Sequence, residues 1–209
     1  MSRQNLQTLN STFSNLSYEQ TIQEANICER CELFATRHNV VFCQGSTPCK
    51  IMVIGEAPGA DEDAQGIPFV GRAGKLLTQM LLSIELNRPE DVYIANTLKC
   101  RPPNNREPKP SEIEACSGFL LRQIAQVKPQ ILVLLGAPAM RTILAPTETI
   151  SKVRGKWFEL DTDYQTATLK VMTLFHPSYL LRNASPEQGS PKWLTWQDLK
   201  LIRQEYNLL

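Results

Sequence analysis

The sequence predicts an α/β sandwich built on a mainly parallel sheet, and the order of its apolar segments carries this prediction. Four short apolar runs have the composition of buried strands, at residues 51–54, 92–95, 131–135 and 171–175. Helical candidates separate or follow these runs, at residues 71–86, 111–127, 138–144 and 193–206. Strands that alternate with helices pair in parallel, because each helix returns the chain to the same end of the sheet.

Individual residues support the expected elements. The first strand closes on Gly55 and the third on Gly136, and Pro110 is a start signal for the helix at 111–127. Residues 1–20 are rich in Ser, Asn and Gln, so we expect a mobile or loosely docked extension before one domain at 21–209. The last segment is expected to pack on the sheet, because its large side chains recur at helical spacing: Trp193, Trp196, Leu199, Ile202 and Tyr206.

Composition excludes some classes of protein. The chain has 209 residues, of which 42% are hydrophobic and 21% charged, as expected for one globular domain. It has no membrane-length apolar run and no secretory leader, so we expect a cytoplasmic protein with no membrane contact. The formal net charge is only +1, so nucleic-acid binding would need a local basic patch. We expect the chain to act as a monomer.

Polar side chains follow three of the predicted strands. Glu56 comes after Gly55, Asn96 closes the second strand, and His176 closes the fourth. The carboxyl ends of parallel strands meet at one edge of a sheet, where ligands bind in such folds. The sequence therefore predicts one crevice that contains a carboxylate, an amide and an imidazole.

Four cysteines have a spacing suited to metal ligation. Cys28 and Cys31 form a C-x-x-C pair, and Cys100 and Cys116 follow at larger separations. Four thiolates can hold structural zinc or an iron–sulfur cluster, and the spacing alone does not distinguish the two. The other two cysteines, Cys43 and Cys49, lack such a pairing and are interpreted as small buried apolar residues.

A basic, proline-rich loop lies between the last two of these cysteines. A metal centre bound at both of its ends would brace the loop and display its cations for phosphate contact, although a solvated basic loop is the simpler alternative. The cations in and beside the loop are Lys99, Arg101, Arg106 and Lys109.

Three separated motifs resemble the family 4 uracil-DNA glycosylases, the iron–sulfur branch of their superfamily. The motifs are GEAPGADEDAQGIPFVGRAGKLL from Gly55, NTLKCRPPNNREP from Asn96 and HPSYLLR from His176. The resemblance covers roughly residues 27–182. It implies a three-layer α/β/α sandwich with a central four-stranded mainly parallel sheet. It also implies a [4Fe–4S] cluster on Cys28, Cys31, Cys100 and Cys116, and an enzyme that releases uracil from single- or double-stranded DNA.

The resemblance also assigns roles in the base pocket. Phe69 matches the position that stacks on the flipped-out base, and Ala57 is expected to line the same pocket. Asn96 is expected to donate to uracil O4 and accept from N3–H, which would reject cytosine. By resemblance, Glu62 fills the space that the methyl group of thymine would need.

Bond cleavage is assigned to two further residues. His176 as a neutral imidazole would donate to uracil O2, and Glu56 would orient the attacking water and favour the cationic sugar. No lysine is suited to a Schiff base, and Lys75 is explained as helix surface or a phosphate contact, so the enzyme should be monofunctional. The segment after His176 resembles the loop that presses into the minor groove, through Ser178, Tyr179, Leu180 and Arg182.

The residues alone leave open three other interpretations of the function. One is a non-enzymatic DNA-binding or replication-accessory module that needs the metal centre only for folding. Another is a superfamily relative that captures its substrate covalently through an inserted Lys-Arg-Arg-Ile-His segment, which this sequence lacks. The last is an unrelated zinc protein with the same four cysteines.

Overall fold

The computed structural model describes residues 16–161 and 168–209, which form a five-stranded sheet in the order β2-β1-β3-β5-β4. Its parallel strands are β1 (Ile51–Gly55), β2 (Val92–Asn96), β3 (Ile131–Leu135) and β5 (Leu169–Leu174). These overlap the four predicted strands, although β5 begins two residues earlier than predicted, and the α/β class with a mainly parallel sheet is confirmed.

The sheet has one strand more than the four expected. β4 (Trp157–Leu160) pairs antiparallel with β5 at one edge. Its side chains are half-buried or exposed, so it lacks the continuous apolar run that identified the other strands.

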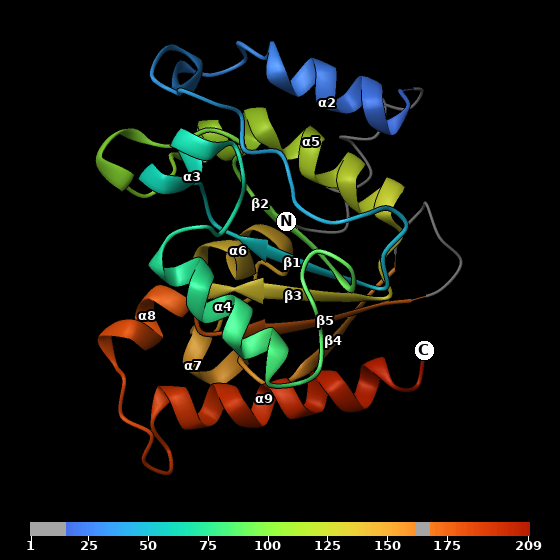
Figure 1. Ribbon diagram of the computed structural model, residues 1–209, viewed down its shortest axis with the longest axis vertical. Coiled ribbons are helices and arrows are strands. Elements are labelled where there is room, and N and C mark those ends of the chain that lie inside the picture. The colour runs from blue at the N-terminus through green and yellow to red at the C-terminus, as the bar shows by residue number, and fades with distance from the viewer. Residues whose placement is uncertain (1–15, 162–167) are drawn as a thin grey trace.

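Helices cover both faces of the sheet (Figure 1). One layer contains α4 (Arg72–Leu82), α7 (Ile150–Val153), α8 (Pro177–Arg182) and α9 (Pro191–Tyr206). The opposite layer contains α2 (Tyr18–Asn26), α5 (Pro110–Val127) and α6 (Gly136–Ile143). Short elements complete the described chain: α3 (Ala60–Gln65) and the 3-10 helices η2 (Glu32–Ala35) and η3 (Pro103–Asn105).

Alternate residues of each buried strand supply the two apolar cores. Val53 of β1 packs toward the layer of α4 and α9, and its neighbour Ile54 packs toward α5 and α6. This alternation follows from the period of two along a strand. The side chains of both cores are buried and closely packed. The sheet therefore holds the residues at the ends of its strands in fixed positions.

Two local boundaries differ from the sequence prediction. The helix expected to reach residue 86 ends at Leu82, because the chain turns there through Glu85 at φ 56°. Helix α2 begins at Tyr18, inside the expected N-terminal extension, and Ser17 caps it by accepting a hydrogen bond from the Gln20 backbone N–H. Residues 1–15 of that extension lie outside the described residues. In the described part of the chain, no helix combines the length and apolar character needed to cross a membrane.

Candidate active site at the strand ends

The three polar side chains predicted at strand ends do line one cavity. Its volume is about 310 Å³, and it lies beyond the carboxyl ends of β1, β2 and β5. The register that pairs Gly55 with Asn96 aligns the ends of β1 and β2, so Glu56 and Asn96 enter the cavity from neighbouring strands. The lining residues are Glu56, Ala57, Pro58, Gly59, Glu62, Phe69, Ala73, Asn96, Pro102, Asn105, Arg106, His176 and Ser178.

Asn96 presents an unsatisfied acceptor at the bottom of the cavity. The residue is 2% exposed, and its Oδ1 atom has no hydrogen-bond partner among the described residues. Gly55 permits this placement, because a Cβ atom there would lie 2.4 Å from Asn96 Oδ1 and 2.5 Å from the Phe69 ring. A buried acceptor without a partner costs free energy unless a ligand supplies the missing donor.

Phe69 forms an aromatic wall beside His176. The two ring centroids are 5.9 Å apart, and the ring planes are tilted by 33°. Phe69 is 7% exposed and has a left-handed backbone conformation, with φ 55°. This conformation is costly for a bulky residue, so the surrounding structure must hold it in place.

His176 is held as a neutral imidazole. The Ser178 backbone N–H donates to His176 Nδ1 over 3.1 Å, so Nδ1 is unprotonated and the ring proton belongs on Nε2. Burial, together with the nearby charge of Arg182, lowers the pKa of His176 to about 4. The imidazole can therefore donate one hydrogen bond at neutral pH without carrying a charge.

Glu56 is the carboxylate of the cavity. Burial raises its pKa above the ordinary value, and the charge of Glu107 adds to the effect. Its backbone carbonyl accepts hydrogen bonds from Leu98 N at 3.1 Å and Thr97 Oγ1 at 2.5 Å, which tie the loop after β1 to the loop after β2. A carboxylate with a raised pKa is suited to take or orient a proton near neutral pH.

The carboxylate of Glu62 is already occupied by the backbone. Its Oε1 accepts the N–H groups of Val70 and Gly71, each at 2.9 Å, and its Oε2 accepts that of Gly59 at 3.1 Å. Glu62 lines the cavity as expected, but its oxygens bind the loop that carries Phe69. The proposed exclusion of a thymine methyl group would therefore be an effect of shape.

The four predicted ligand cysteines line one small hollow, together with Leu33, Leu98 and Phe119. None of the four forms a disulfide with a described residue, and Arg37 Nη1 donates to Cys100 Sγ over 3.4 Å. Lys99, 2% exposed, lies beside them. Among the described residues, no three such side chains are close enough to form a single-ion site. Four cysteine side chains around one hollow form a donor set suited to a metal centre with thiolate ligands.

The other two cysteines are placed elsewhere in the fold. Cys43 Sγ lies 3.1 Å from the Tyr18 hydroxyl, and Cys49 Sγ donates to the carbonyls of Ile51 and Asp91. Both pack against the core on the α5 and α6 side of the sheet. Both are half-buried packing residues, whereas the sequence predicted buried ones.

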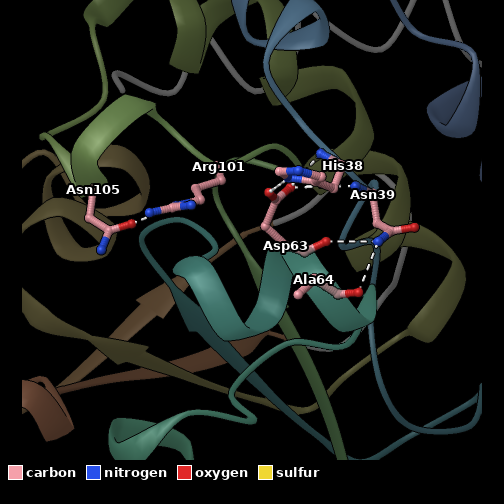
Figure 2. Close-up of polar contacts among 6 residues, drawn as sticks. All are labelled: His38, Asn39, Asp63, Ala64, Arg101 and Asn105. Carbon is pink, nitrogen blue, oxygen red and sulfur yellow. Dashed lines mark hydrogen bonds and ion pairs between the residues drawn. The ribbon is translucent and has the colours of Figure 1, made fainter.

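Cations of the basic loop are engaged by neighbouring groups. Arg106 makes a bidentate contact with Glu112, at 2.9 and 2.5 Å, although it also lines the cavity. Lys109 Nζ lies 3.0 Å from Glu32. Arg101 donates to Asn105 Oδ1 over 2.8 Å, as Figure 2 shows. Direct phosphate contact by Arg101 or Arg106 stays a prediction. To make it, each guanidinium would have to leave its present hydrogen-bond partner or bind the partner and a phosphate at once.

Helix α8 divides the predicted DNA-contacting segment. Leu180 is 3% exposed and packs in the core with α4 and α9, so it is not available as a wedge. Tyr179 and Leu181, at 37% and 38% exposure, are the apolar side chains that face outward, and Arg182 is exposed beside them. The helical period explains why Leu180 is buried while Tyr179 and Leu181 are exposed. Successive residues of an α-helix point in different directions, so only some of them face solvent.

Sequence reasoning missed several residues that shape the cavity. Ser178 was assigned to DNA, yet its backbone N–H and hydroxyl both contact His176 Nδ1. Pro102 and Asn105 close the cavity from the basic loop, and Asn105 has φ 53°. The Asn-Asn pair after two prolines is a turn signal that could have indicated this.

Comparison with known proteins gives the family. Residues 42–200 match the model of the uracil DNA glycosylase superfamily. A type-4 uracil-DNA glycosylase of Archaeoglobus fulgidus is 45% identical over 169 residues, covering 79% of this chain and 83% of the relative. One from Thermotoga maritima is 47% identical over 161 residues, covering 77% and 81% respectively. This chain belongs to the type-4 uracil-DNA glycosylases. The resemblance carried by the three motifs is thereby confirmed, and an unrelated zinc protein is excluded.

Proposed function

We propose that this type-4 family member hydrolyses the N-glycosidic bond of deoxyuridine in DNA, releasing uracil and leaving an abasic site for base excision repair. The observation that carries the proposal is the Oδ1 atom of Asn96, which has no hydrogen-bond partner in residues 16–161 and 168–209 and is buried in a cavity shared with Phe69, Glu56 and His176. A base that brings an N–H donor to this acceptor satisfies it, and uracil has such a donor at N3.

Recognition would follow from the fixed amide. With Oδ1 accepting from N3–H, the amide N–H₂ of Asn96 donates to O4, whereas cytosine has the opposite pattern at both positions. The Phe69 ring supplies a stacking surface, which is worth about 1–3 kcal/mol per base. The base must leave the DNA stack to reach this cavity, and these contacts offset part of that cost.

Cleavage would use the two remaining side chains. As the bond breaks, negative charge develops on the uracil ring, and the Nε2–H of neutral His176 donates to O2. Glu56 in its ionised form orients a water molecule and stabilises positive charge on the sugar. Ser178 maintains the Nε2–H tautomer, since its backbone N–H donates to His176 Nδ1. The chemistry requires no lysine nucleophile, in keeping with a monofunctional enzyme.

A [4Fe–4S] cluster is proposed on Cys28, Cys31, Cys100 and Cys116. The four thiols line one hollow, and the cations of Arg37 and Lys99 lie beside it to balance thiolate charge. When bound, the cluster would supply a rigid cross-link between the N-terminal segment and the two ends of the basic loop. Lys99 Nζ donates to the Asn96 carbonyl over 2.6 Å, so this bracing would reach the base pocket.

An abasic-site assay on uracil-containing oligonucleotides tests the proposal. Cluster-loaded protein should release uracil from single-stranded and duplex DNA without a nucleotide cofactor, and Glu56→Ala and His176→Ala should each reduce the rate. Absence of uracil release by the loaded wild-type protein would favour the DNA-binding accessory module. The expected monomer is checked by light scattering in the same preparation.

A further inference from the structure

The backbone around Phe69 has little support from regular structure. Residues 66–71 form turns between α3 and α4, and Phe69 itself has φ 55°. The start of α4 comes so close that a Cβ atom at Gly74 would lie 1.8 Å from the Phe69 carbonyl oxygen. The aromatic wall of the pocket therefore depends on side chains that bind the turn from outside.

Arg88 binds this turn through its carbonyl groups. Its Nη1 atom donates to the Phe69 carbonyl over 3.0 Å, and its Nη2 atom donates to the Pro68 carbonyl over 2.9 Å. Arg88 Nη1 also lies 3.2 Å from Thr78 Oγ1 on α4. One planar guanidinium thus holds two successive carbonyls and the adjacent helix, an arrangement that the single ammonium of lysine cannot reproduce.

The same guanidinium is anchored to the strand that carries Asn96. Arg88 Nε donates to Gln44 Oε1 over 2.9 Å, and Arg88 Nη2 contacts the same oxygen. The Gln44 backbone pairs with Ile94 of β2 through hydrogen bonds of 2.9 and 2.7 Å. Asn96 follows two residues along that strand, so Arg88 connects the stacking residue to the strand of the base-reading residue.

Glu62 binds the opposite set of backbone groups in the same turn. It accepts the N–H groups of Val70 and Gly71, whereas Arg88 takes the carbonyls of Pro68 and Phe69. The backbone on either side of the Phe69 ring is therefore clamped by two side chains of opposite charge. Unlike Glu62, Arg88 is not among the described residues that line the cavity, so it acts on the pocket through the groups that it binds.

We propose that Arg88 is a positioning residue, which holds Phe69 in its left-handed conformation and thereby sets the affinity of the pocket for the flipped base. This inference rests on the proposed uracil excision. Base stacking on Phe69 is made by both the bound substrate and the transition state, so its loss weakens binding more than it slows the chemical step.

Kinetics of Arg88→Met and Arg88→Lys on a uracil-containing single-stranded oligonucleotide test the proposal. Loss of the charge-assisted bonds should raise KM about tenfold, with kcat changed by less than about threefold. Inhibition by free uracil measures the affinity of the pocket for the base in the absence of DNA contacts. The inhibition constant Ki of uracil should rise by a similar factor. Arg88→Lys keeps the charge and serves as the folded variant if Arg88→Met does not fold, and it should also show the rise.

A double-mutant cycle separates positioning from a general loss of structure. In a Phe69→Ala background, Arg88→Lys should change neither KM nor the Ki of uracil further, because the ring that it positions is gone. Arg203→Met is the matched control: Arg203 pairs with Glu85 over 2.9 Å, away from the cavity, and its loss should leave both constants unchanged.

Two results would overturn the proposal. Wild-type KM and Ki in folded Arg88→Lys would mean that Phe69 needs no such support, and additive effects in the cycle would mean that Arg88 acts elsewhere. A wild-type protein that releases no uracil would instead reject the proposed function, and this inference with it.

Discussion

The rings of Phe69 and His176 lie with centroids 5.9 Å apart and face one cavity, although their residues are more than a hundred positions apart in the chain. Phe69 comes from the turn before α4, and His176 from the end of β5. In the proposed mechanism, a base stacked on the Phe69 ring would lie beside the Nε2–H donor of His176. The two rings thus form adjoining parts of the same cavity, although separate elements of the fold position them.

The loss of activity at low pH should reflect the protonation of Glu56. Burial raises the pKa of Glu56 above its ordinary value of about 4.3, and its ionised form is the active one, so activity is lost as pH falls through that raised pKa. His176, with a pKa of about 4, stays neutral over the same range and should not contribute. Glu56→Gln should reduce kcat by about 10²–10⁴ and remove this loss at low pH from the residual activity. If Glu56→Gln still loses activity at low pH with the wild-type midpoint, the loss must be due to another group.

Asn96→Ala should separate stability from activity. The Asn96 Oδ1 atom is buried without a partner in the described structure, so its removal relieves a desolvation cost and the midpoint of thermal unfolding should not fall. Uracil release should nevertheless decrease by about 10²-fold or more, since both base-reading hydrogen bonds are lost. Calorimetry and the abasic-site assay measure the two effects on one preparation. A strongly destabilised variant would mean that Asn96 is mainly structural.

The sequence predicted the parts of this site that depend on strand ends. Glu56, Asn96 and His176 each follow an apolar run, and parallel pairing brings such positions to one edge of the sheet. Periodicity could not place Leu180, because a six-residue helix has too short a pattern to tell its buried side from its exposed one. The family motifs suggested a role for Glu62 at the base, but only the folded turn reveals the three backbone N–H groups that occupy its carboxylate.

Arg88 and β4 illustrate what remained invisible to sequence reasoning. Arg88 lies in a loop with no motif, and its importance comes from carbonyls that are about twenty residues away along the chain. β4 is a half-buried edge strand without an apolar run. Both depend on long-range contacts, whereas propensity and spacing report local preferences.

Replacement of one proposed ligand should remove the iron. Cys100→Ala is expected to lose the brown colour, iron and acid-labile sulfide, and to unfold at a lower temperature, because the cross-link at this end of the basic loop is gone. Cys49→Ala is the control: its thiol lies against the carbonyls of Ile51 and Asp91, so iron content should be retained. Iron and sulfide analysis of both proteins decides the outcome. Full iron content in Cys100→Ala would contradict the ligand set.

Asp63 should contribute acid-sensitive stability to the helix that carries Glu62. Figure 2 shows its carboxylate beside His38, whose Nδ1 lies 2.7 Å from Oδ2 and whose backbone N–H donates to Oδ1 over 3.0 Å. The side chain of Asn39 also donates to the carbonyls of Asp63 and Ala64, so the segment after η2 is fastened to α3. Burial alone would raise the pKa of Asp63, but the hydrogen bonds from His38 and Asn39 outweigh it and lower that pKa.

The sign of the pH effect follows from this lowered pKa. The stabilisation is fully present above the unfolded pKa of about 3.9 and is lost as pH falls through the lower folded value. Asp63→Asn should therefore reduce the free energy of unfolding by about 1–3 kcal/mol at pH 7, and the difference from wild type should shrink below about pH 4. Urea unfolding at a series of pH values measures this difference, with Asp61→Asn, an exposed residue of the same helix, as the control. A difference independent of pH would mean that the carboxylate charge is irrelevant and that only the shape of the side chain holds α3 in place.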